Sequence, residues 1–174
     1  MLQKPARFPF RAVFLMLAAT TLAGCGGSAP AAVGPAAEQI VFTSAADCAA
    51  TGKIKEAQCG QAIEAALQQH LAGSTVYRTL TLCETTEGAD KCERMDAKAY
   101  RPKLVAMVVN SNDAIQAEAS GTPLSAIPLY PTLAGEHGFR KLDKTILLVE
   151  GDLIVFSPQA VAAAELNATT ATPY

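Results

Sequence analysis

The sequence contains no tryptophan, and aromatic residues account for only 6% of its 174 positions. Binding sites for sugars or single-stranded nucleic acid usually need aromatic rings for stacking, so this composition argues against both ligands. The formal charge is −2, and the interior of the chain has no basic cluster. Nucleic acid is therefore not an expected partner.

Catalytic motifs are equally scarce. The chain has two histidines, neither a Gly-x-Ser-x-Gly elbow nor a phosphate-binding glycine loop, and no Cys-x-x-Cys pair. His70 follows the apolar face of a predicted helix and is expected to be a packed core or boundary residue. Glu136 and His137 lie in a glycine-flanked loop and form a possible acid–base pair without a third member. We predict a protein that is not an enzyme and holds no cofactor or metal; an envelope hydrolase using Glu136 and His137 is the alternative.

The N-terminus has the features of a lipoprotein signal peptide. Residues 1–24 combine three basic side chains with the apolar run AVFLMLAATTLA and end in Leu-Ala-Gly before Cys25. This ending resembles the bacterial lipobox, in which the cysteine thiol receives a diacylglycerol and the peptide is cut just before it. We therefore expect lipidation at Cys25 and a flexible Gly/Ala/Pro tether over residues 25–39.

Removal of the signal peptide makes the chain more acidic. It takes away three of the 14 basic residues and none of the 16 acidic ones, which leaves a formal charge of −5 (11 − 16). Such a body is not attracted to anionic headgroups, so the lipid is expected to be the membrane anchor. Gly26 follows the lipidated cysteine, where an Asp would suggest retention at the inner membrane. The expected location is the bacterial cell envelope, on the outer membrane facing the periplasm.

Two stretches of the chain look like copies of one another, VFTSAADCAATG from Val41 and VYRTLTLCETTEG from Val76. Each opens with Val and an aromatic ring and places a hydroxyl four residues before a cysteine. One further cysteine follows each unit, so the four cysteines are Cys48, Cys59, Cys83 and Cys92.

The chain has five cysteines, and with Cys25 taken by the lipid four remain. An even number in an exported protein predicts two disulfides, for which three pairings are possible. Loop entropy favours long loops over local ones by only about 1 kcal/mol and does not choose among the pairings. If the two units are structural copies, each closes its own loop, as Cys48–Cys59 and Cys83–Cys92; pairing across the units remains the alternative. Separations of ten and eight residues argue against zinc.

Hydrophobic patterning predicts mostly helices in the first half of the chain. A strand at QIVF (residues 39–42) precedes a short helix that starts at Ser44, with Asp47 as part of a capping box. The clearest helix covers residues 55–73, with one face formed by Cys59, Ile63, Ala66, Leu67 and His70. A second short helix is expected around Cys83, with Thr79 as its N-cap.

The second half has more β-branched residues. Residues 101–110 suit a strand, and 111–138, broken by Gly and Pro, are expected to be mostly loop with a short helix. Residues 144–156 predict a hairpin around Glu150-Gly151-Asp152, and a helix follows from Ser157.

These patterns predict an α+β fold. A small, disulfide-stapled helical region at 40–98 is followed by a β-containing region at 99–166 with a hairpin, within the same domain. Residues 167–174 form the expected tail.

The cysteine spacing supports a resemblance to a known family. Asp47-Cys48, ten residues, Cys59, twenty-three residues, Cys83, eight residues and Cys92 is similar to the YgiB-like family of uncharacterised bacterial envelope lipoproteins, over roughly residues 40–93. Many members carry a long Gly/Ser/Gln-rich tail that this chain lacks. The resemblance implies a membrane-tethered accessory protein with no known catalytic residue or cofactor. Its expected partner is another envelope protein or a cell-wall component.

A small-ligand or cell-wall binding module is a further alternative. It would use Tyr77, Tyr100, Tyr130 and Phe139 to line a groove. Aromatic side chains more often belong to the core, and a core position is the favoured interpretation of these four.

Overall fold

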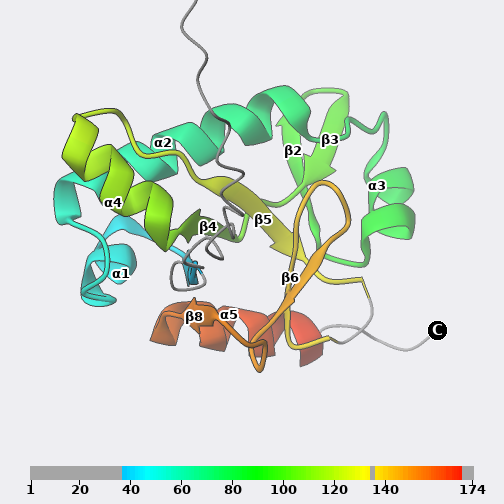
Figure 1. Cartoon of the computed structure of the whole chain (residues 1–174). Helices are drawn as coiled ribbons and strands as arrows, with labels where there is room; N and C mark the ends of the chain where they lie inside the picture. The colour runs from blue at the N-terminus through cyan, green and yellow to red at the C-terminus, as the bar shows by residue number, and fades with distance from the viewer. Residues whose placement is uncertain (1–36, 134–135, 170–174) are drawn as a thin grey trace, which may run out of the picture. The chain divides into compact units, whose positions relative to one another are not determined.

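The computed structural model describes residues 37–133 and 136–169, so the predicted signal peptide, Cys25 and most of the tether lie outside the described residues. Five helices and eight strands occur in the described part, as Figure 1 shows in chain order. They are β1 (Gln39–Phe42), α1 (Ala45–Ala50), α2 (Glu56–Gly73), α3 (Leu80–Glu87), β2 (Cys92–Asp96), β3 (Ala99–Pro102), β4 (Ala106–Asn110), α4 (Ser111–Ser120), β5 (Ile127–Pro131), β6 (Gly138–Arg140), β7 (Ile146–Leu148), β8 (Ile154–Phe156) and α5 (Pro158–Thr169).

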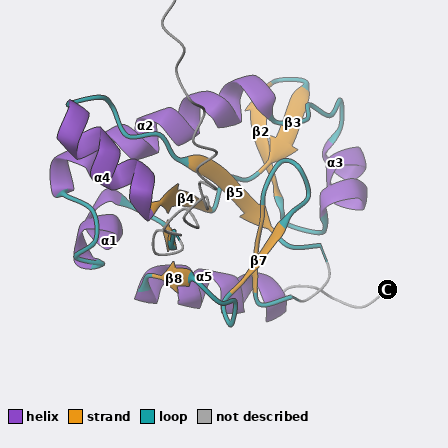
Figure 2. Cartoon of the chain, in the orientation of Figure 1, coloured by secondary structure: helices purple, strands orange, loops and turns teal. Residues whose placement is uncertain are grey.

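Six of these strands form one sheet in the order β7-β6-β5-β4-β1-β8. The neighbours in this sheet are antiparallel except for β1 and β8, which run parallel. The other two strands, β2 and β3, form a separate antiparallel hairpin beside α3, visible in Figure 2. The fold is therefore α+β, as the sequence predicts.

Helices cover both faces of the large sheet, and the alternation of side chains along the strands explains why. In β1, Ile40 and Phe42 belong to a core cluster with residues of α1, α2 and α4, whereas Val41 belongs to a second cluster with residues of α5. Because successive side chains of a strand point to opposite faces, the three consecutive apolar residues that end β1 need cover on both sides. In Figure 1, α2 and α5 accordingly lie on opposite sides of the sheet.

The two copied sequence units fold into the same local structure. The Ser44 hydroxyl accepts a hydrogen bond from the Asp47 N–H at 3.2 Å and caps α1. The Thr79 hydroxyl accepts from the Leu82 N–H at 3.1 Å and caps α3. A capping oxygen satisfies a backbone donor that the first helical turn leaves without a partner. Each unit thus places its cysteine one turn into a capped helix.

Both disulfides have the pairing that the repeat predicts. Cys48 and Cys59 join α1 to α2, with 5.9 Å between their Cα atoms, and both are fully buried in the main core. Cys83 and Cys92 join α3 to β2, with 6.2 Å between their Cα atoms. The second disulfide belongs to a separate small cluster with Tyr77 and Tyr100, so the two bridges stabilise different parts of the fold.

A hairpin is present in the C-terminal region, but it is formed by β6 and β7. The predicted hairpin within residues 144–156 is wrong, because its first strand pairs with β6 and its second strand, β8, pairs in parallel with β1. Leu147 of β7 packs against Phe139 of β6 in the α5-side cluster, which accounts for the first pairing. The partner of β8 lies more than 100 residues earlier in the chain and leaves no local signal.

Two other expectations for the second half need correction. Residues 111–138 are not mostly loop, because they contain α4 and β5. Strand β5 tolerates its prolines because Pro128 is paired with β4 alone and Pro131 with β6 alone. Neither residue therefore has to form backbone hydrogen bonds to strands on both sides, which proline, without an N–H group, could not do. The predicted strand at 101–110 is divided: its first two residues belong to β3, which ends at Pro102, and residues 106–110 form β4 in the large sheet.

Candidate functional site

A groove of about 430 Å³ lies between the start of α3 and the turn of the β2–β3 hairpin. We call it the α3 groove. Its lining comes from two segments that the chain brings together, and it consists of Arg78, Thr79, Leu80, Ala97, Lys98 and Tyr100. The groove is thus built on the second copied unit and on the hairpin that carries the cysteine paired with it.

Backbone and disulfide bonds hold the two walls of the α3 groove together. Tyr77 and Tyr100 exchange two backbone hydrogen bonds, of 2.8 and 2.9 Å, which attach the segment before α3 to β3. The Tyr100 ring packs against the cluster of Tyr77, Cys83 and Cys92. Because the disulfide joins α3 to β2, the helix and the hairpin cannot separate without breaking a covalent bond.

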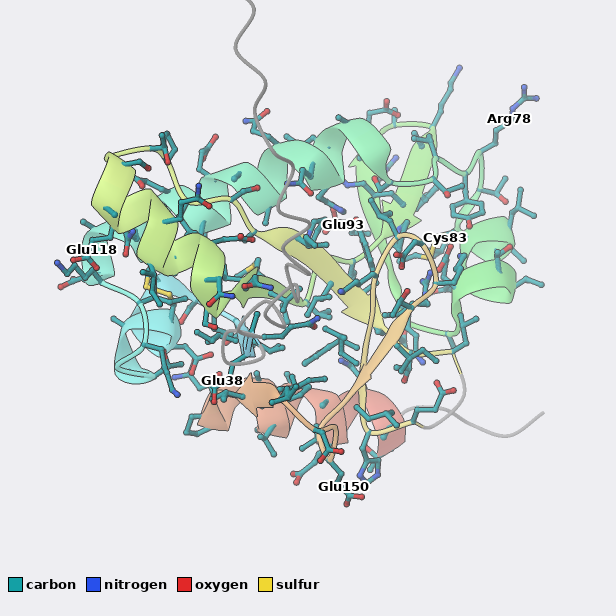
Figure 3. The ribbon with its side chains drawn as sticks, viewed as in Figure 1. Glu38, Arg78, Cys83, Glu93, Glu118 and Glu150 are labelled. Atoms are coloured by element: carbon teal, nitrogen blue, oxygen red, sulfur yellow. A yellow bond between two sulfur atoms is a disulfide. The ribbon has the colours of Figure 1, made fainter. Side chains whose placement is uncertain are left out.

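The charges that line the α3 groove have one sign. Arg78 and Lys98 form no ion pair within the part of the chain that the structure describes, and no carboxylate belongs to the lining. Figure 3 shows the Arg78 side chain extending away from the body of the molecule beyond α3 and the hairpin. The positive end of α3 lies at the same place, since its first residue is part of the wall.

A buried ion pair lies behind this region. The Arg140 guanidinium of β6 donates to the Glu87 carboxylate at the end of α3, and the two side chains are only 5% and 2% exposed. The Tyr77 hydroxyl donates to the same carboxylate at 2.5 Å. The Arg140 guanidinium also lies 5.9 Å from the centre of the Tyr130 ring, in cation–π geometry. These contacts attach α3 to the large sheet.

Burial and the nearby charged groups change the pKa values of the two tyrosines in this network. Burial, together with the hydrogen bond to Glu87, raises the pKa of Tyr77 to about 12. Burial also raises the pKa of Tyr130 to about 12, although the positive charges of Arg101 and Arg140 oppose the shift. Both phenols are therefore neutral hydrogen-bonding groups at neutral pH rather than catalytic bases.

A second polar chain attaches the hairpin to α2. His70 is buried, with Nδ1 3.0 Å from the Tyr130 hydroxyl and Nε2 3.1 Å from a Glu93 carboxylate oxygen. The Arg101 guanidinium donates to that oxygen at 2.6 Å. Burial opposes ionisation of Glu93, but the hydrogen bonds from Arg101 and His70 outweigh it and lower the pKa of this carboxyl. His70 is a packed core residue, as its place on the apolar face of the helix predicts.

Lys91 is the most deeply buried ammonium group of the region. Its Nζ donates to the backbone oxygen of Thr132, and burial lowers its pKa, partly offset by the charge of Glu136. The carboxylate of Glu136 therefore interacts with an interior lysine, while His137 beside it is exposed. Glu136 and His137, the acid–base pair of the hydrolase alternative, therefore lie in different environments, one beside a buried lysine and the other exposed.

The four aromatic residues considered for a binding groove do not line one together. Tyr77, Tyr130 and Phe139 are buried, as the core interpretation predicts. Tyr100 alone reaches the α3 groove. Arg78 and Lys98 cannot be singled out from the sequence, because a single Arg and a single Lys separated by twenty residues give no pattern that links them. The sequence pattern around Thr79 indicates only a helix cap.

Other classes of site find little support in the described residues. No group of three or more His, Cys, Asp or Glu side chains there could hold a metal ion. No helix among residues 37–133 and 136–169 is long and apolar enough to cross a membrane. The described residues form an α+β domain with two local disulfides and a groove lined by two cations.

Comparison with known proteins gives the chain a family. A model of a family described as proteins of unknown function, DUF1190, matches residues 36–135, and the chain belongs to that family. The match includes the four disulfide-bonded cysteines and extends beyond residues 40–93, the segment that resembles the envelope lipoproteins. No curated protein and no solved structure matches the chain.

Proposed function

We propose that this protein is a lipid-anchored component of the bacterial envelope that binds another envelope component at the α3 groove and catalyses no reaction. The observation that carries the proposal is the pair of unpaired cations, Arg78 and Lys98, beside the Tyr100 ring. Unpaired charges beside a half-buried aromatic ring in a braced groove are typical of a recognition site.

The anchoring part of the proposal rests on the sequence. The basic residues, the apolar run and the lipobox-like ending at Cys25 all favour export and lipidation. The tether over residues 25–39 would then allow the folded part to reach a partner away from the membrane surface. The two disulfides favour the oxidising periplasm over the cytoplasm, and the expected face is the periplasmic side of the outer membrane.

We propose that the protein is not an enzyme because His70 and Glu87, two side chains that could serve in catalysis, are engaged in contacts within the fold. Both ring nitrogens of His70 have partners in the interior, and the Glu87 carboxylate receives Arg140 and the Tyr77 hydroxyl. Groups engaged in this way stabilise the fold and are not available to a substrate.

Replacement of Cys25 tests the anchor. We expect Cys25→Ser to lose incorporation of radiolabelled palmitate and to leave the membrane fraction, with the fold unchanged. Cell fractionation and metabolic labelling measure both effects. Palmitate labelling that persists in Cys25→Ser would contradict lipidation at this residue.

In-cell photocrosslinking tests the binding function. A photoactivatable amino acid at Ala97 would lie in the α3 groove, and the same residue at Ile115, 67% exposed on α4, is the matched control. We expect a discrete crosslinked product from position 97 and not from position 115. Identical products from both positions, or no product from either, would contradict binding at the groove.

A further inference from the structure

We propose that the α3 groove recognises an acidic peptide segment with an apolar side chain, presented by a protein partner. This inference rests on the proposed binding function and names the chemistry of its ligand. Three features carry it: the sign of the groove's charge, the apolar surface beside that charge and the covalent bracing of both walls.

The charge of the groove is opposite to that of the chain around it. The two cations of the lining face no carboxylate within the groove, whereas the mature chain as a whole has a formal charge of −5. Four of the other basic side chains form ion pairs with carboxylates, among them Lys53 with Glu38 and Lys55 with Glu118. A local positive site on an acidic body attracts a short acidic segment. An extended anionic surface such as a membrane would meet the repulsion of the rest of the chain.

Apolar side chains lie beside the two cations. Leu80 and Tyr100 contribute to the lining, and Leu80 is 40% exposed. Val76, two residues before Arg78 in the chain, is 57% exposed. A ligand side chain that covered Leu80 and the Tyr100 ring would remove apolar surface from water, which favours binding. The ligand therefore combines carboxylates with at least one apolar residue.

The second disulfide prepares the groove for binding. It fixes the start of α3 against the hairpin before a ligand arrives, so less conformational entropy is lost on association. A peptide that binds between two fixed walls needs fewer contacts for a given affinity than one that must order them.

Fluorescence anisotropy with short labelled peptides tests the inference on the full mature protein in detergent. The probes are an Asp/Leu peptide, a Lys/Leu peptide and an Asp/Ser peptide of equal length. We expect the Asp/Leu peptide to bind at least about tenfold more tightly than either of the others, a difference of about 1.4 kcal/mol. Its affinity should fall as salt is added, because the charges are exposed to solvent.

Charge reversal locates the binding. The double variant Arg78→Glu/Lys98→Glu should bind the Asp/Leu peptide about tenfold more weakly, or weaker still. Lys141→Glu combined with Lys144→Glu changes the net charge equally outside the α3 groove and should leave affinity within about twofold. Circular dichroism verifies that both variants fold. Equal loss in the two double variants would overturn the assignment, because it would indicate net charge rather than the groove.

The remaining outcomes separate this inference from the proposed function. Binding to phosphatidylglycerol vesicles in preference to the Asp/Leu peptide would overturn the peptide ligand. A crosslinked protein partner at position 97, together with no preference for acidic peptides, would refute the ligand chemistry and leave the binding function standing. Absence of any specific crosslinked product at position 97 would contradict both the proposed binding function and the inference about its ligand.

Discussion

The buried ion pair between Arg140 and Glu87 gives the sharpest stability prediction. We expect Arg140→Met to lower the free energy of unfolding by about 3–5 kcal/mol, because it leaves the Glu87 carboxylate buried without its cation. Part of the loss comes from the cation–π contact with Tyr130, worth about 1 kcal/mol. A small domain has a total stability of about 5–15 kcal/mol, so this single change should be conspicuous.

A double-mutant cycle separates the pair from its surroundings. Glu87→Gln keeps an acceptor for the Tyr77 hydroxyl and removes the charge, so the combined Arg140→Met/Glu87→Gln variant should recover a large part of the stability lost in Arg140→Met. Urea denaturation followed by circular dichroism measures all four proteins. A loss below about 1 kcal/mol in Arg140→Met, or a double variant less stable than both single ones, would refute the reasoning.

Two further predictions concern glycine and tyrosine. A Cβ at Gly138 would lie 2.1 Å from the backbone oxygen of Leu147, so Gly138→Ala should destabilise the β6–β7 hairpin by about 3 kcal/mol. Gly60 lies in the second turn of α2 with free space around it, so Gly60→Ala should stabilise the protein by about 0.5–1 kcal/mol in the same urea titration. Stability should also fall between about pH 10 and pH 12, because folded Tyr77 and Tyr130, with pKa values of about 12, keep protons that the unfolded chain releases near pH 10. Urea midpoints measured at stepped pH give the slope of stability against pH. Tyr77→Phe and Tyr130→Phe should each make this slope smaller, and an unchanged slope in both variants would contradict the prediction.

The sequence predicted what local chemistry determines. The capped helices at Ser44 and Thr79 were predictable because a hydroxyl at the N-cap satisfies a donor of the same turn. The long helix was predictable because its apolar side chains recur at helical spacing, and Cys59, Ala66 and His70 are indeed buried. The disulfide pairing was predictable because each unit repeats the same local pattern.

The errors concern pairing between distant segments. Strand β8 lies beside β1, although an adjacent hairpin was expected, because the edge of β1 offers a partner that no local pattern reveals. The prolines of β5 suggested loop, since the sequence does not indicate that each of them has only one paired neighbour. The α3 groove depends on Tyr77 meeting Tyr100 across more than twenty residues, so neither its shape nor its charge could be predicted.

The copied units have the same local structure but different environments, and this difference bears on function. Each disulfide closes a short loop, with sequence separations of 11 and 9, so the entropic model assigns about 3 kcal/mol to each. The first is enclosed in the main core, where packing would hold α1 and α2 together in any case. The second lies in a small cluster beside the surface, where little apolar burial holds α3 to the hairpin. A covalent bridge contributes most to order where packing contributes least, and that is where the α3 groove lies.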